Sequence, residues 1–180
     1  QADFASTYVK DQLAQQQITF AIEEDLDGEQ DDAPCLIEFA GTALDSGKKA
    51  ECYANEFIAY HMAESAKAAG YEGETYATIG PIRAGLNADL EAAQEAGEDT
   101  EELQAKVDAI TLLRETMFKG ETLRGLLLTT FGFSIFGERA DTAALVCFLA
   151  AALLLLLSAG GFAHALTSDK ADKIVLPLEG

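Results

Sequence analysis

The fold is decided by residues 143–163, which read AALVCFLAAALLLLLSAGGFA. These 21 residues carry no charge, and they include the unbroken leucine run Leu153 to Leu157. A helix needs about 20 apolar residues to cross the ~30 Å hydrocarbon core of a bilayer. A buried helix of a soluble protein is usually shorter and has polar residues on one face. The stretch therefore predicts a transmembrane helix, to which we assign residues 142–166.

Outside this stretch the chain is strongly acidic. Its 180 residues include 31 Asp and Glu against 12 Lys and Arg, which gives a formal net charge of −19 at pH 7. Residues 1–141 hold 28 of the acids and 10 of the bases. Nucleic-acid binding depends on Lys and Arg that displace counterions from phosphates, so this balance argues against nucleic acid as a partner. The length fits one polar domain joined to one membrane helix.

The polar part has helical periodicity and no strand pattern that persists beyond about five residues. We expect helices at residues 3–17, 36–44, 48–69 and 81–97, with an acidic loop at residues 23–32. Gly70 is expected to end the third helix in the left-handed conformation, and Pro81 to open the fourth. Asp99 and Glu102 have the spacing of a capping box for a further helix. The predicted fold class is all-α, a helical domain followed by a C-terminal transmembrane helix.

The segment 120–141 is apolar but too short to span a bilayer, and it has two interpretations. As an amphipathic helix at the membrane surface, it would direct Arg124 at phosphates or at a partner's carboxylate. Phe131, Phe133 and Phe136 would then enter the acyl boundary or a neighbouring protein. Alternatively, these residues close the core of the polar domain. The predicted organisation is an acidic helical domain at 1–119, this segment at 120–141, the span at 142–166 and a short tail at 167–180.

The three cysteines fall in two environments. Cys35 and Cys52 lie in the polar domain and enclose 16 residues, whereas Cys147 lies in the predicted span. A pair at this spacing fits a disulfide, which persists in oxidising compartments. The alternative is two unrelated buried thiols, because free cysteine is common in protein cores.

Charge alone leaves the orientation of the span open. Arg124 and Arg139 precede it and Lys170 and Lys173 follow it, so the positive-inside rule counts both flanks about equally. The cysteine pair therefore decides the prediction. We expect a cell-membrane protein with its large domain extracytoplasmic and its C-terminal tail cytoplasmic.

Residues with catalytic or ligand-binding chemistry do not form a known signature. Gly132, Ser134 and Gly137 give G-x-S-x-x-G, whereas a nucleophile elbow requires G-x-S-x-G. His61 and Glu64 are spaced for one metal ion, but the further Glu and His ligands of a di-iron bundle are missing. The acidic loop does not follow the EF-hand pattern, because its glycine stands at the wrong place. We therefore expect no catalytic residue, no metal site and no cofactor.

Inside the predicted span, Ser158, Gly160 and Gly161 form a patch of small residues near the C-terminal end. Small side chains allow a second helix to approach closely. Because such residues are common in any membrane helix, the patch is only a weak indication of a partner.

Three blocks of the sequence carry a resemblance to a known family. They are YVKDQLAQQQITF at residues 8–20, GKKAECYANEFIAYHM at 47–62 with GETYATIG at 73–80, and KGETLRGLLLTTFGFSIFG at 119–137. Together they cover about half of the chain. They resemble a family of small actinobacterial membrane proteins with an envelope-facing helical segment, some of which associate promiscuously with the respiratory supercomplex of cytochromes bcc and aa3.

The resemblance implies a helical domain held between two membrane anchors, with the first anchor N-terminal to Gln1. It also implies a non-enzymatic accessory subunit whose partners are lipid and respiratory cytochrome subunits. The alternative is an envelope-facing module that binds a small molecule or a basic protein. The residues expected to contact a partner are Arg124, Phe131, Phe133, Phe136, Ser158, Gly160 and Gly161.

Overall fold

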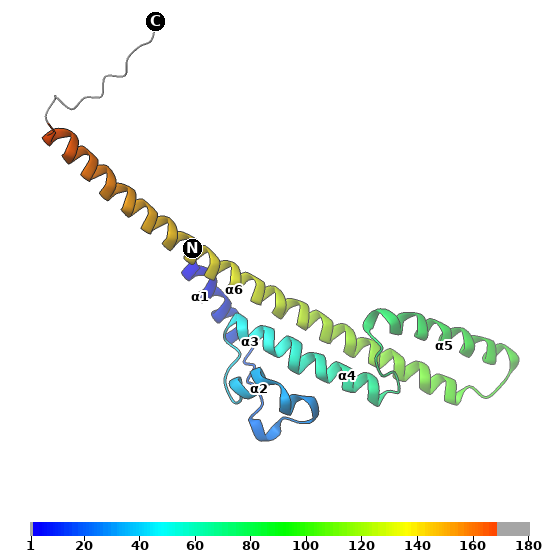
Figure 1. Cartoon of the computed structure of the whole chain (residues 1–180). Helices are drawn as coiled ribbons and strands as arrows, with labels where there is room; N and C mark the ends of the chain where they lie inside the picture. The colour runs from blue at the N-terminus through cyan, green and yellow to red at the C-terminus, as the bar shows by residue number, and fades with distance from the viewer. Residues whose placement is uncertain (1, 169–180) are drawn as a thin grey trace, which may run out of the picture. The chain divides into compact units, whose positions relative to one another are not determined.

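The computed structural model describes residues 2–168. All of the secondary-structure elements named among these residues are helical (Figure 1). The α-helices are α1 (Ala2–Ala14), α2 (Pro34–Phe39), α3 (Gly47–Cys52), α4 (Ala59–Ala68), α5 (Tyr76–Ala96) and α6 (Glu101–Thr167). The shorter elements are the 3-10 turns η1 (Glu23–Asp25) and η2 (Gly28–Asp32) and the π-helix η3 (Tyr53–Ile58). The prediction of an all-α chain with one long apolar helix is confirmed. Residues 169–180, most of the predicted tail, lie outside the described residues.

The chain divides into two units, Gln1–Gly137 and Glu138–Gly180, and α6 contributes residues to both. In the first unit, α6 also continues through the predicted boundary between residues 119 and 120. Residues 120–137 are therefore the last part of α6 that belongs to this unit.

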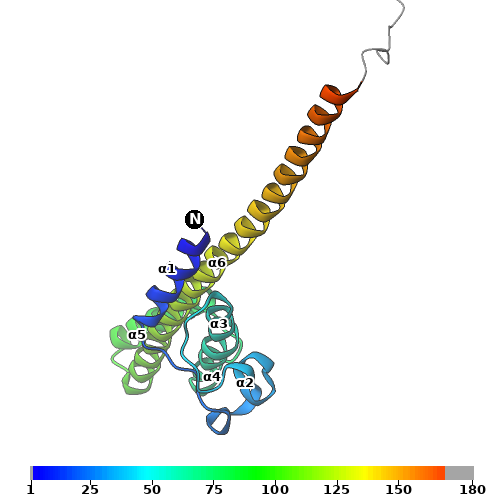
Figure 2. The ribbon, with the colours of Figure 1, turned by 90° about the vertical axis from the view of Figure 1, so that its left-hand side faces the viewer.

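The core of the first unit forms where the other helices pack on α6. Figures 1 and 2 both show α1 lying along α6 within this unit. From Ile110 to Met117, residues of α6 enter the core at spacings of three and four, which place them on one face of a helix. The core residues of α6 are Ile110, Leu113, Met117 and Leu127. The largest fully buried side chains of the unit are Leu36, Leu44, Ile79 and Ile110.

Residues 47–68 form one continuous helical stretch through α3, η3 and α4, close to the predicted helix at 48–69. The Ser46 hydroxyl accepts a hydrogen bond from the backbone N–H of Lys49 and caps its start. Gly70 follows its end with φ +80°, as predicted. The π-helical turn in the middle was not predicted, since it leaves no mark in the apolar periodicity.

One predicted helix start and one predicted capping box are wrong. Helix α5 begins at Tyr76, five residues before the predicted Pro81, because Thr75 and Thr78 form a reciprocal capping box that starts the helix there. Pro81 lies inside α5, where it removes one helical hydrogen bond. At the start of α6, Asp99 accepts from the N–H of Glu101, while Glu102 pairs with Lys106 instead of completing a capping box.

A disulfide joins Cys35 of α2 to Cys52 of α3, with 6.0 Å between the two Cα atoms. The predicted disulfide is therefore present. Residues 18–21 and 41–44, on either side of α2, are joined by backbone hydrogen bonds and by a single antiparallel bridge between Thr19 and Ala43. The acidic segment between them is built from η1 and η2 and is anchored by buried Leu26 and Gln30.

Candidate functional site

The part of α6 within the second unit is an apolar helix with no cover from its own unit. Every described residue from 138 to 168 is exposed, including the run Leu153 to Leu157. Among the described residues this is the one helix long and apolar enough to cross a membrane. Burying one exposed leucine contributes about 1.5–3 kcal/mol, so this surface requires an apolar environment. A membrane location is compatible with this exposed surface.

The small-residue patch lies on the same exposed helix. Ser158 is exposed, and no atom would meet a Cβ added at Gly160 or Gly161 within 4 Å. Gly161 and Ala165 are four residues apart, which places them on one side of the helix. The patch is therefore open to an approaching helix, and partner contact there stays a prediction.

An apolar groove of about 450 Å³ runs between α1 and α6 within the first unit. We call it the α1/α6 groove. The side chains that line it are Tyr8, Val9, Gln12, Leu13, Gln16, Ile18, Leu123, Leu126, Leu127, Thr129, Thr130 and Phe133. Leu126 is 62% exposed although apolar side chains line the groove around it, whereas Leu127, the next residue, is buried. Helix α6 therefore presents one apolar face to the core and a second one to the groove.

The predicted contact residues of α6 do not all face this groove. Phe133 lines it, and its ring meets the ring of Tyr8 edge to face with centroids 6.4 Å apart. Phe136 is 79% exposed and Phe131 is half-buried, and neither belongs to the groove lining. The contribution of α1 was missed, because neither segment alone carries a signal that residues 8–18 pack against residues 123–133.

Arg124 is bound within its own unit. Its Nε donates to the Ala54 carbonyl at 3.0 Å, and its Nη1 donates to the Glu121 carboxylate at 3.2 Å. Ala54 lies in the π-helix, where carbonyls bond to the N–H five residues on instead of four. Arg124 thus ties α6 to η3, a role that the sequence analysis missed. Contact between Arg124 and a partner stays a prediction.

The other residues singled out for chemistry have structural contacts. The Ser134 hydroxyl donates to the Phe131 carbonyl at 2.7 Å. The His61 ring packs edge to face on Phe57 and Tyr60. Among the side chains that the structure describes, no three of His, Cys, Asp or Glu come close enough together to hold a metal ion. The groove is lined by apolar, hydroxyl and amide side chains, and at the end of the exposed span the Ser168 hydroxyl lies 3.3 Å from His164 Nε2.

Comparison of the chain with protein-family models, curated proteins and solved structures found no match. Over the residues that the structure describes, the protein is all-helical. It has a disulfide-linked domain and one helix long and apolar enough to cross a membrane.

Proposed function

We propose that this protein is a non-enzymatic accessory subunit of a larger membrane complex, anchored by α6 and docked through packing contacts. The observation that supports it best is the exposed span together with the open α1/α6 groove. A membrane anchor needs only the span. A second unfilled apolar surface on the first unit favours a partner protein.

The proposed partner is a respiratory assembly of the cytochrome bcc and aa3 type in an actinobacterial membrane. Its support is the resemblance carried by three sequence blocks. Two of these blocks, residues 8–20 and 119–137, supply all the side chains that line the groove. The segments that carry the resemblance are thus the segments that form the candidate docking surface.

The proposed orientation has the first unit on the extracytoplasmic side. Its support is the Cys35–Cys52 disulfide, because such bonds form and persist in oxidising compartments. The disulfide is the stronger argument here, since Lys and Arg flank the span about equally on its two sides.

Co-purification in mild detergent tests the proposed function. Wild-type protein should be retained by tagged cytochrome subunits at a fixed stoichiometry, and Leu126→Glu should reduce the retained fraction at least tenfold. A carboxylate buried in a close-packed apolar interface without a partner is strongly unfavourable. Leu112→Glu is the matched control, because Leu112 is a 66% exposed leucine of the same helix outside the groove.

Two results would contradict the proposal at different points. If wild-type protein is never retained by cytochrome subunits, the respiratory partner is wrong. If Leu126→Glu and Leu112→Glu are retained equally, docking uses another surface, and the exposed small-residue patch at Gly160 and Gly161 becomes the segment to vary. Tyrosine fluorescence should confirm that both variants are folded, since all five tyrosines lie in the first unit.

The proposed orientation predicts a definite protease pattern. Protease added outside wall-stripped cells should cut within the acidic segment 23–32, which is exposed at most of its positions, and should leave the tail 167–180 intact. The fragments can be identified by mass spectrometry with and without detergent permeabilisation. Cleavage of the tail alone from outside would reverse the orientation.

A further inference from the structure

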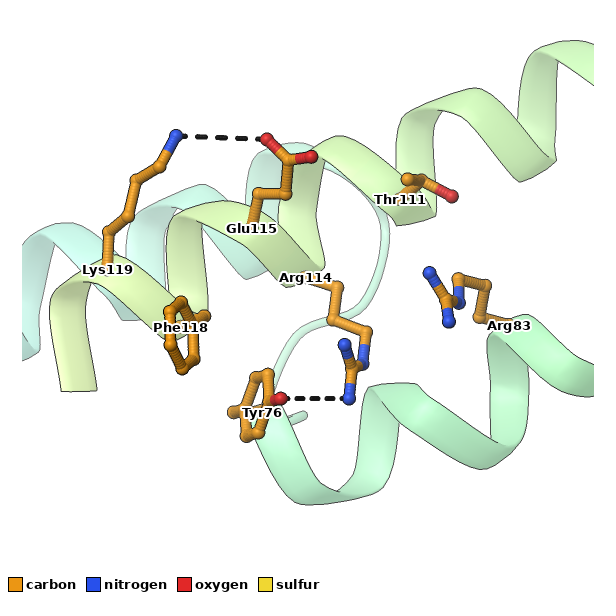
Figure 3. A pocket seen from close by; sticks show the side chains of 7 residues that line it. All are labelled: Tyr76, Arg83, Thr111, Arg114, Glu115, Phe118 and Lys119. Atoms are coloured by element: carbon orange, nitrogen blue, oxygen red, sulfur yellow. Dashed lines mark hydrogen bonds and ion pairs between the residues drawn. The ribbon is translucent and has the colours of Figure 1, made fainter. Parts of the chain in front are cut away.

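A second concave surface of the first unit has the opposite character to the rest of this acidic chain. It lies between α5 and α6, has a volume of about 450 Å³, and is lined by Tyr76, Arg83, Thr111, Arg114, Glu115, Phe118 and Lys119. We call it the basic cleft. Figure 3 shows Arg83 reaching from α5 and Arg114 reaching from α6 into the same space.

Arg114 is held in place without a carboxylate. Its guanidinium carbon lies 4.4 Å from the centre of the Tyr76 ring, and its Nη2 donates to the Tyr76 hydroxyl at 2.9 Å. Its Nε is buried and has no hydrogen-bond partner in the described part of the chain. A buried N–H donor without an acceptor is costly. Protein atoms enclose this Nε, so a ligand in the cleft would be bound through Nη1, which makes no hydrogen bond to the described residues.

Neither arginine forms an ion pair with a side chain that the structure describes. In this chain acids outnumber bases by 31 to 12, so a carboxylate near each guanidinium is the expected arrangement. The carboxylate of the cleft, Glu115, lies 3.7 Å from Lys119 instead (Figure 3). Two guanidiniums therefore converge from opposite walls with their charge unmatched.

The charge of the cleft indicates the class of ligand. Arg83, Arg114 and Lys119 against Glu115 give a formal charge of +2. A phosphate monoester carries about −1.5 to −2 at neutral pH, whereas a carboxylate carries −1. Guanidiniums also bind phosphate oxygens in a forked geometry with two parallel hydrogen bonds.

The aromatic side chains of the cleft indicate what the phosphate is attached to. The rings of Tyr76 and Phe118 lie 5.7 Å apart at the cleft edge, and Phe118 is 56% exposed. An exposed ring beside a charged site offers a surface on which a flat apolar group can stack. The cleft volume falls within the range of about 300–1,000 Å³ typical of small-molecule sites.

We infer that the basic cleft binds a small phosphate monoester that carries a flat apolar group. The phosphate lies between Arg83 and Arg114, and the apolar group lies on Phe118. This site is separate from the α1/α6 groove, because the two share no lining residue. It does not depend on the proposed respiratory partner.

Titration of the full chain in mild detergent with phenyl phosphate tests this inference, with heat of binding or phosphorus NMR line width as the readout. Saturable binding is expected at physiological ionic strength. Arg83→Gln should weaken it at least about tenfold, because a charge-assisted pair of hydrogen bonds is lost. The Arg83 side chain forms no hydrogen bond or ion pair with the described residues, so Arg83→Gln should leave the fold intact. Lys106→Gln is the control, since Lys106 lies on the same helix outside the cleft.

The choice of probe separates the parts of the inference. Inorganic phosphate should bind more weakly than phenyl phosphate, and Phe118→Ala should remove that difference. Benzoate should bind more weakly than phenyl phosphate because it carries one charge. Tighter binding of benzoate, or equal binding by wild type and Arg83→Gln, would overturn the assignment, as would the absence of saturable phenyl phosphate binding.

Discussion

Replacing both Cys35 and Cys52 by alanine should lower the free energy of unfolding of the first unit by about 3 kcal/mol. The disulfide closes a loop with a sequence separation of 17, and the loss of unfolded-chain entropy on closing such a loop accounts for this magnitude. Cys52 is also 5% exposed, so its removal leaves a small gap in the core. The effect is a large fraction of the 5–15 kcal/mol, roughly, that stabilises an ordinary domain.

Tyrosine fluorescence during urea unfolding in mild detergent measures this change. The chain has five tyrosines and no tryptophan, and all five tyrosines lie in the first unit, so the signal reports on that unit alone. Cys147→Ser is the matched control, because this free cysteine lies in the exposed span and should leave the midpoint unchanged. A reductant should shift the wild-type midpoint as the double variant does. An unchanged midpoint in both cases would show that the bond does not stabilise the unit.

The features that sequence predicted well are those encoded by residues close together in the chain. The uncharged run 143–163, the cysteine pair and the left-handed Gly70 each depend on local composition or spacing. Even the error at Pro81 is local, since the competing signal was the Thr75 and Thr78 capping box five residues upstream. There the side-chain caps outweighed the preference of proline for the first helical turn.

The features that sequence missed depend on which helices meet. One interpretation directed Arg124 at lipid phosphates or at a partner's carboxylate, but its guanidinium bonds to a π-helical carbonyl 70 residues earlier. Likewise Arg83 and Arg114 are separate charges in the sequence and converge only when α5 packs on α6. Neither the Arg124 hydrogen bond nor the convergence of Arg83 and Arg114 leaves a periodic signal in the sequence, so neither could be inferred from one chain.

The contact between α3 and α6 is the second feature whose change should have a large effect. Gly47 is buried at the start of α3, and a Cβ added there would overlap the Ser134 hydroxyl and lie 2.6 Å from the Ser134 Cβ. The backbone of α6 limits any retreat, because the Phe131 Cα is 3.4 Å away. Gly47→Ala should therefore destabilise the first unit by about 1–3 kcal/mol, the usual effect of overpacking a close helix contact.

A double-mutant cycle distinguishes this steric effect from a local effect on α3. Ser134→Gly alone should cost about 1 kcal/mol, because glycine disfavours a helix interior. Combined with Gly47→Ala it removes the overlapping atoms, so the double variant should be more stable than the sum of the two changes by about 1 kcal/mol or more. Gly125→Ala on α6 is the control. No atom lies within 4 Å of its added Cβ, so alanine should be neutral or stabilising by up to about 1 kcal/mol. Strict additivity of Gly47→Ala and Ser134→Gly in the urea midpoints would mean that α3 and α6 are not in contact at this point.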